Sequence, residues 1–313
     1  MNAPSAAVAA PLDEPGIVPA PPVRDAPWFD RDGYPFRSHT LELAEGRLHY
    51  LDEGHGPAVL FVHGTPSWSY DQRALIGALS TRYRCIAPDL LGFGLSDRPT
   101  RVGEPLALHT KHVAELLRAL DIDRYALVAH DFGGPIGLTV ALDDPRRLRA
   151  VCLMNTWAWS MAEDPEFEKL RRLAGSALMR CLYRYANFSA RVMVKSSWGK
   201  RTPLTRTRHR HFTALFPNRA SREGTWAFAR SLVTDDARFD AIGARLGALG
   251  ETPALVVWGM ADRFVGAPHL ARWKRELPHA RFVEIDDAGH FPHDEAPDDV
   301  LAALEPLLDA TRA

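Results

Sequence analysis

Three residues with complementary chemistry each follow a short apolar run in the sequence: Asp131, Asp262 and His290. An aspartate is ionised at neutral pH, so its carboxylate can attack a saturated carbon directly and form an alkyl ester. A histidine oriented by a second carboxylate can then activate water to hydrolyse that ester. These residue types predict a two-step hydrolysis in which Asp131 is the nucleophile, His290 the base and Asp262 the acid.

The stretch around Asp131 has the pattern of a sharp turn from a strand into a helix. An apolar run ends at Ala129, Gly133 stands two residues after the aspartate, and an apolar repeat of helical spacing begins at Ile136. Both flanking residues must be small because the strand and helix backbones nearly touch there, and glycine tolerates dihedral angles that other residues avoid. We therefore expect Asp131 at the tip of a nucleophile elbow.

Hydrolysis of the ester creates a negatively charged oxygen that needs hydrogen-bond donors. The natural donors are the backbone N–H groups of Phe132, directly after the nucleophile, and of Thr65, in the HGTP turn. Each such donor typically lowers the barrier by about 3–4 kcal/mol. His63 and His130 flank the site, and we expect structural roles for both.

The elements that must position these residues alternate along the chain. Two short alternating runs at 39–43 and 47–52 predict an antiparallel hairpin. Strand-length apolar runs then alternate with helical stripes, which implies right-handed crossovers and an α/β fold with a mostly parallel central sheet and helices on both faces. The expected strands are 58–62, 83–87, 125–129, 150–154, 254–258 and 280–285, and the expected helices are 70–79, 109–120, 136–142 and 298–308. Loops at the carboxyl ends of such strands are where this architecture places its site.

The alternation of strands and helices stops after Asn155 and returns only at residue 254. Residues 156–231 show helical stripes and no convincing strand. We therefore expect a helical cap at 156–231, inserted into an α/β core made of residues 34–155 and 232–313.

The first 33 residues are rich in proline and alanine. They have no basic start and no continuous apolar core, so they do not have the pattern of a secretory signal. We expect a mostly disordered tail at 1–33 that packs through Trp28 and Phe29.

The composition of the 313 residues is that of an ordinary globular protein, long enough for one large domain with a sizeable insertion. The formal net charge of −1 gives the chain no nucleic-acid signature. No run approaches the roughly 20 apolar residues of a membrane span. Cys85, Cys152 and Cys181 lack metal or redox spacing, which favours a reducing cytoplasm. We expect a small-molecule substrate, no nucleic-acid or membrane partner, no metal and no cofactor.

Six segments resemble the haloalkane dehalogenase branch of the α/β-hydrolases. They are HGTPSWSY (63–70), YRCIAPDLLGFGLSDRP (83–99), AHDFGGPIGL (129–138), LMNTWAW (153–159), VVWGMAD (256–262) and DAGHFPHDEAP (287–297). The resemblance extends over residues 34–313 and implies an α/β-hydrolase fold with Asp131 as nucleophile, His290 as base and Asp262 as acid. Asn155 occupies the alternative position for the acid, where we expect it at most to support the histidine.

The leaving-group site is where this sequence differs from the family pattern. Haloalkane dehalogenases bind the departing halide with a tryptophan directly after the nucleophile, together with an asparagine in the HGNP turn or a tryptophan from the cap. Phe132 and Thr65 stand at the first two of these positions. The tryptophans of the predicted cap that could substitute are Trp157, Trp159, Trp198 and Trp226. The expected substrate pocket contains Trp157, Trp159, Tyr183 and Phe291.

Other reactions of related enzymes stay open. Epoxide hydrolases share the aspartate nucleophile but need two cap tyrosines, and Tyr183 and Tyr185 would differ by about 200° around a helix, so at most one can face the pocket. The β-lactone decarboxylases of olefin synthesis are another branch of the same group of related enzymes, and this reaction also stays open. Fluoroacetate dehalogenases need an arginine directly after the nucleophile, and Phe132 excludes them. A non-enzymatic alternative is a hydrolase-fold protein that only binds a ligand.

The predicted cap is strongly basic. Residues 157–231 contain fifteen Lys or Arg and five Asp or Glu, a net charge of +10, which leaves −11 for the rest of the chain. A solvated helical face would account for this excess. Two functional alternatives are docking on the acidic core of a second copy, which would give a homo-oligomer, and steering of an anionic substrate towards the site.

Overall fold

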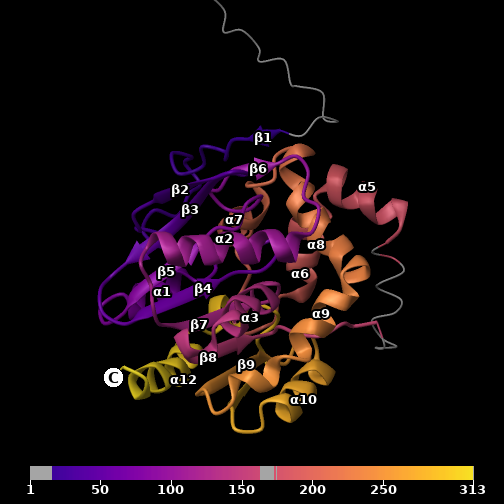
Figure 1. Cartoon of the computed structure of the whole chain (residues 1–313). Coiled ribbons are helices and arrows are strands. Elements are labelled where there is room, and N and C mark those ends of the chain that lie inside the picture. The colour runs from indigo at the N-terminus through magenta and orange to yellow at the C-terminus, as the bar shows by residue number, and fades with distance from the viewer. Residues whose placement is uncertain (1–15, 163–172, 174, 313) are drawn as a thin grey trace, which may run out of the picture.

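The computed structural model describes residues 16–162, 173 and 175–312. These residues form an eight-stranded sheet in the order β10-β9-β8-β7-β4-β5-β3-β2 (Figure 1). Its strands are β2 His39–Leu43, β3 Gly46–Glu53, β4 Ala58–Val62, β5 Arg84–Pro88, β7 Tyr125–His130, β8 Leu148–Met154, β9 Ala254–Gly259 and β10 Arg281–Ile285. β2 and β3 form the predicted antiparallel hairpin, and the six strands from β10 to β5 run parallel, which confirms the predicted sheet.

The parallel strands lie in the centre of the molecule because their side chains are apolar on both faces. β4, β7 and β9 are buried along their whole length. Continuous apolar runs of this kind suit strands that are covered by helices on both sides. α2 (Pro105–Ala119) packs on α3 (Gly133–Asp143), and α1 (Arg73–Leu79) packs on α12 (Pro297–Ala310) (Figure 1).

The clearest differences from the expected helices are in α2 and α10 (Ala267–Glu276). α2 begins at Pro105, four residues earlier than predicted, because proline fits the first turn of a helix. α10 was not predicted. Its buried side chains include Leu270 and Trp273, three residues apart, and charged residues occupy much of the rest, so only a narrow apolar stripe marks this helix.

The described residues between β8 and β9 contain helices and no strand. These inserted helices are α5 Ala177–Ala186, α6 Val194–Ser197, α7 Arg206–Thr213, α8 Glu223–Thr234 and α9 Asp236–Gly243, with a π-helical turn at Ser189–Met193. α8 continues past the expected end of the cap at residue 231. Residues 163–172 and 174 of the expected cap lie outside the described residues. Across the described chain, no helix has the length and apolarity needed to cross a membrane.

The expected disorder of residues 1–33 is wrong for the part from residue 16 onward. β1 (Ile17–Val18) pairs with β6 (Arg98–Pro99) in a small antiparallel sheet. Phe29 is buried and packs against Tyr34 and Trp68, while Trp28 contacts His211. Proline prevents regular helix here but leaves the aromatic side chains free to pack. Residues 1–15 lie outside the described residues.

Candidate active site

Asp131 lies at the tip of the tight turn between β7 and α3. Its φ angle of +52° falls in the left-handed region, which is costly for a residue other than glycine. A Cβ atom on Gly133 would lie 2.0 Å from the carbonyl oxygen of Val62 on the neighbouring strand. The glycine is therefore required sterically, and the backbone holds the aspartate in a strained conformation at the end of β7.

The structure brings together the side chains of Asp131, His290 and Asp262 at the carboxyl edge of the parallel strands. His290 Nδ1 lies 2.7 Å from Asp262 Oδ2, and His290 Nε2 lies 3.3 Å from Asp131 Oδ2. All three side chains are buried. The imidazole therefore stands between two carboxylates, with one at each ring nitrogen.

The charge of His290 follows from this position. Burial alone would lower the pKa of His290, but the carboxylates of Asp262 and Asp131 outweigh burial and raise the pKa to about 10. The two carboxylates therefore favour the protonated form of His290 in the resting site. Loss of the charge of either carboxylate would favour the neutral form, which can accept a proton.

Asn155 supports the acid of this set. Its Nδ2 donates to Asp262 Oδ2 at 2.9 Å and to the carbonyl oxygen of Gly259 at 3.1 Å, and its Oδ1 accepts from the N–H of Gly259 at 2.8 Å. Asn155 therefore fixes the Asp262 carboxylate to the end of β9, and its effect on His290 is transmitted through that carboxylate.

A cavity of about 80 Å³ adjoins the triad, and Asp131 and His290 both line it. The five other sequence candidates that line it are Thr65, Phe132, Trp157, Tyr183 and Phe291. Sequence reasoning missed the apolar lining residues Met161, Met193, Val194, Leu232, Phe264 and Val265. Most of these residues belong to the inserted helices and the loop after β9. No sequence pattern indicates which side chains of these segments point towards the cavity.

The expectation that Trp159 belongs to this pocket is wrong. Its ring packs against Trp273 of α10 with centroids 4.8 Å apart, and the Arg272 guanidinium lies 4.3 Å from its ring centroid. Trp159 lines a separate hollow that includes His269. Because α10 was not predicted, this aromatic partner could not be foreseen.

The fold and the side-chain arrangement together match a known family. The family model described as alpha/beta hydrolase fold matches residues 57–297. The chain belongs to the α/β-hydrolase family. Haloalkane dehalogenase 2 of Mycobacterium tuberculosis is 34% identical to this α/β-hydrolase over 280 residues, which cover 87% of this chain and 94% of that relative. The protein is a haloalkane dehalogenase-like hydrolase, as its sequence motifs predicted.

This α/β-hydrolase is also similar to a decarboxylase in sequence and to a second dehalogenase in structure. The cis-3-alkyl-4-alkyloxetan-2-one decarboxylase of Shewanella oneidensis is 31% identical over 290 residues, covering 88% of this chain and 90% of that relative. The solved structure of haloalkane dehalogenase DatA from Agrobacterium tumefaciens has a TM-score of 0.78 at 23% identity, covering 88% of this chain and 97% of that one. The structural likeness confirms the α/β-hydrolase fold.

Besides Asp131 and His290, the polar side chains that line the cavity of this hydrolase are those of Thr65, Trp157, Tyr183, Ser189 and Ser197. Trp157 Nε1 and Thr65 Oγ1 are buried and have no hydrogen-bond partner among the described residues. The Tyr183 hydroxyl donates to Met193 Sδ at 2.9 Å, and burial, followed by the charge of Asp131, raises the pKa of Tyr183. Tyr185 is 61% exposed, so only one of the two tyrosines faces the cavity, as predicted.

Glu295 was not singled out by sequence reasoning, although it anchors the loop that carries His290. Its carboxylate accepts hydrogen bonds from the backbone N–H groups of Gly289 at 3.0 Å, Phe291 at 3.3 Å and Gly199 at 2.7 Å. Burial raises the pKa of Glu295 to about 7 even though these donors favour the charged form. The side chain joins the histidine loop to the segment that follows α6.

Proposed function

We propose that this α/β-hydrolase cleaves a small haloalkane through an alkyl ester on Asp131, which water activated by His290 then hydrolyses. The observation that carries this proposal is the orientation of the Asp131 carboxylate. Oδ1 accepts a hydrogen bond from the backbone N–H of Thr65 at 2.8 Å, and Oδ2 faces His290. One oxygen is thus held by a backbone donor, and the other, which pairs with His290, is the one that would attack the substrate.

In the first step, Asp131 Oδ2 forms a bond to the carbon that bears the halogen, and the carbon–halogen bond breaks with its electron pair on the halide. Two groups suit the departing halide, the indole N–H of Trp157 and the hydroxyl of Thr65, since both lack partners in the described structure and both residues line the cavity. A buried donor without a partner costs about 1–3 kcal/mol, which a bound halide would offset. These groups would replace the family's tryptophan and asparagine.

In the second step, the ester has removed the charge of Asp131, so one of the two carboxylates that raise the pKa of His290 is gone. The histidine can then lose its proton and accept one from water, which attacks the carbonyl carbon of the ester. The oxyanion forms on Oδ1, beside the Thr65 N–H that already contacts that atom and the N–H of Phe132. Collapse of this intermediate releases the alcohol and restores the carboxylate, so the sum is R–X + H₂O → R–OH + HX.

The size and polarity of the cavity limit the substrate. A cavity of about 80 Å³ is smaller than the roughly 150 Å³ apolar cavity that accommodates benzene. Its walls are mainly apolar, and the charged groups that line it belong to the triad. A short, uncharged haloalkane of a few carbons fits these properties best.

A substrate with an oxygen leaving group is the second candidate, supported by Tyr183 and by the oxetanone decarboxylase relative. Tyr183 lines the cavity and keeps its proton because burial and the charge of Asp131 raise its pKa. Its hydroxyl could donate to the ring oxygen of an epoxide or a β-lactone when Asp131 attacks the adjacent carbon. Only one such tyrosine is available, which makes this candidate weaker than the haloalkane.

The test uses His290→Gln protein, in which ester hydrolysis is blocked and the adduct should accumulate. We would incubate it with 1-bromopropane, with a short epoxide and with a β-lactone, then weigh the intact protein and map the modified residue. We expect the mass of a propyl group on Asp131 with release of bromide. Asp131→Asn in the same background is the control and should gain no mass.

The other results would distinguish the alternatives. An adduct from the epoxide or the β-lactone alone would replace the haloalkane by an oxygen leaving group and point to Tyr183 as its donor. No adduct from any compound, together with thermal stabilisation by one of them, would favour a ligand-binding protein with a hydrolase fold.

A further inference from the structure

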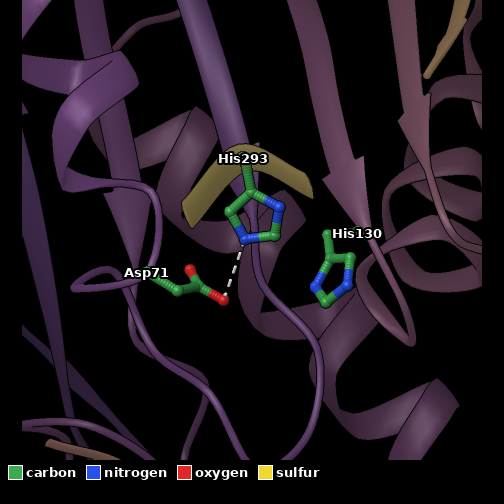
Figure 2. Close-up of side chains that lie close together, drawn as sticks. All are labelled: Asp71, His130 and His293. Atoms are coloured by element: carbon green, nitrogen blue, oxygen red, sulfur yellow. Dashed lines mark ion pairs between the residues drawn. The ribbon is translucent and has the colours of Figure 1, made fainter. Parts of the chain in front are cut away.

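A second group of chemically active side chains lies behind the triad, away from the substrate cavity. It consists of Asp71, in the segment between β4 and α1, His130, the last residue of β7, and His293, on the short helix α11 (Pro292–Glu295). Figure 2 shows the three side chains converging from these separate segments. All three are fully buried, and none of them lines the cavity, so the proposed hydrolysis does not use them.

His130 presents a free lone pair to this group. Its Nε2 lies 2.7 Å from the carbonyl oxygen of His290, and since a carbonyl can only accept, Nε2 carries the proton. Nδ1 is therefore an acceptor, and no donor in the described part of the chain reaches it.

Asp71 adds a further electron pair beside this nitrogen, and His293 Nε2 would add another once it gives up the proton that it shares with the Asp71 carboxylate. Asp71 Oδ2 accepts a hydrogen bond from Ser67 Oγ and lies 3.1 Å from His293 Nε2, while Oδ1 has no hydrogen-bond partner among the residues described. A buried carboxylate oxygen and a buried imidazole lone pair thus face the same space. A buried acceptor without a partner destabilises the folded protein, and a cation bound between these acceptors would offset that cost.

We propose that Asp71, His130 Nδ1 and His293 Nε2 form a binding site for a divalent transition-metal ion of the Zn²⁺ class. The potential ligand atoms all lie within 4.8 Å of one another. In a tetrahedral Zn²⁺ site they would lie about 3.4 Å apart, so side-chain rotation would have to draw them closer when the ion binds. Two imidazoles and one carboxylate suit Zn²⁺, and water or Ser67 Oγ could supply the fourth ligand.

The surroundings of His130 fit a metal ligand. A histidine that binds a metal usually donates its other ring N–H to a carbonyl or carboxylate, which fixes its tautomer, and the bond from His130 to the His290 carbonyl does this. His130 directly precedes Asp131, and His293 follows His290 by three residues. The ion would therefore tie together the segments that carry the nucleophile and the base. Because the site is fully buried, the ion would enter as the chain folds.

The full chain is unfolded in the presence of a chelator, refolded with Zn²⁺ and then desalted. The test measures the Zn²⁺ content of the refolded protein. We expect about one Zn²⁺ per refolded chain and about a tenfold lower content in Asp71→Asn and His293→Gln. The matched control is His109→Gln, since His109 of α2 is also fully buried and neither of its ring nitrogens has a hydrogen-bond partner in the described structure. This variant should retain as much Zn²⁺ as the unaltered protein.

A second measurement needs no variant. Refolding with Co²⁺ should give the visible absorption of a tetrahedral cobalt ion with nitrogen and oxygen ligands. Refolding to native circular dichroism without bound Zn²⁺ and without this absorption would overturn the proposal and leave a water molecule or a proton as the occupant. Equal Zn²⁺ in the unaltered protein and in both cluster variants would also overturn it, because the ions would then sit on other histidines. Both readouts are independent of haloalkane turnover.

Discussion

The rings of Trp157 and Phe132 pack edge to face with their centroids 5.0 Å apart, beside the carboxylate of Asp131. Phe132 occupies the position directly after the nucleophile, and Trp157 is buried with an indole N–H that has no partner among the described residues. Of the four tryptophans considered from the sequence, only Trp157 lines the cavity. Under the proposed mechanism, the leaving-group donor would therefore be the Trp157 ring, which the residue after the nucleophile holds in place, and not that residue itself.

Trp157→Phe should therefore slow halide release while it keeps the packing of the ring. Loss of one well-placed donor typically costs about 10²-fold in kcat, and we expect a decrease of that order in kcat with a bromoalkane. Trp159→Phe is the control, since Trp159 packs on Trp273 outside the cavity. Equal bromide release from both variants would show that Trp157 does not contact the leaving group.

Asn155 should affect the second step more than the first, because it holds the carboxylate that stabilises the protonated histidine. Asn155→Ala removes the 2.9 Å bond to Asp262. We expect about a tenfold slower ester hydrolysis, visible as a larger burst of halide before the steady state. Asn187→Ala is a matched control, since Asn187 is also buried with a positive φ angle but lies outside the triad. A lower burst rate with unchanged steady-state turnover would contradict this role.

His290 should make the stability of the protein depend on pH between about 6.5 and 10. Its pKa rises from an ordinary 6.5 to about 10 in the folded protein, so the folded state binds this proton more tightly than the unfolded state does. The stabilisation is fully present below pH 6.5 and is lost as the pH rises through about 10. His290→Gln should flatten this decline in chemical unfolding experiments, whereas His279→Gln, at an exposed position, should not. Identical slopes for the unaltered protein and His290→Gln would contradict the ion-pair arrangement.

The parallel sheet and the meeting of three distant side chains could be predicted because both follow from local rules. Buried parallel strands must be apolar runs, and residues just after such strands meet at one edge of the sheet. Asp131 and Asp262 each follow closely after the end of such a strand. His290 does so through the glycine-bearing loop after β10.

The parts that sequence reasoning missed depend on packing between distant segments. Trp157 and Trp159 are two residues apart and chemically identical, yet one faces the cavity and the other faces α10. The lining from the inserted helices depends on how those helices are rotated, which one sequence does not reveal. Asp71 and His293 meet through the fold alone, since 222 positions separate them in the chain (293 − 71).

Glu295 should give a second and separate pH dependence of stability at lower pH. Its pKa rises from an ordinary 4.5 to about 7 because the folded protein buries the carboxyl group, so the folded state holds this proton where the unfolded state has released it. Stability should therefore fall as the pH rises from about 4.5 to about 7, by at most about 3 kcal/mol. The window lies mostly below that of His290, so the two effects can be measured in one titration.

Glu295→Gln should remove this decline, because glutamine stays uncharged at every pH and still offers one oxygen to the N–H groups of Gly289 and Phe291. The measurement is the free energy of unfolding in urea at intervals from pH 4 to pH 8, with Glu251→Gln as a control at an exposed position. The slope, and not the absolute stability, is the readout, since the glutamine N–H₂ cannot accept from Gly199. Parallel curves for the unaltered protein and Glu295→Gln would mean that these three donors keep the carboxylate charged throughout the range.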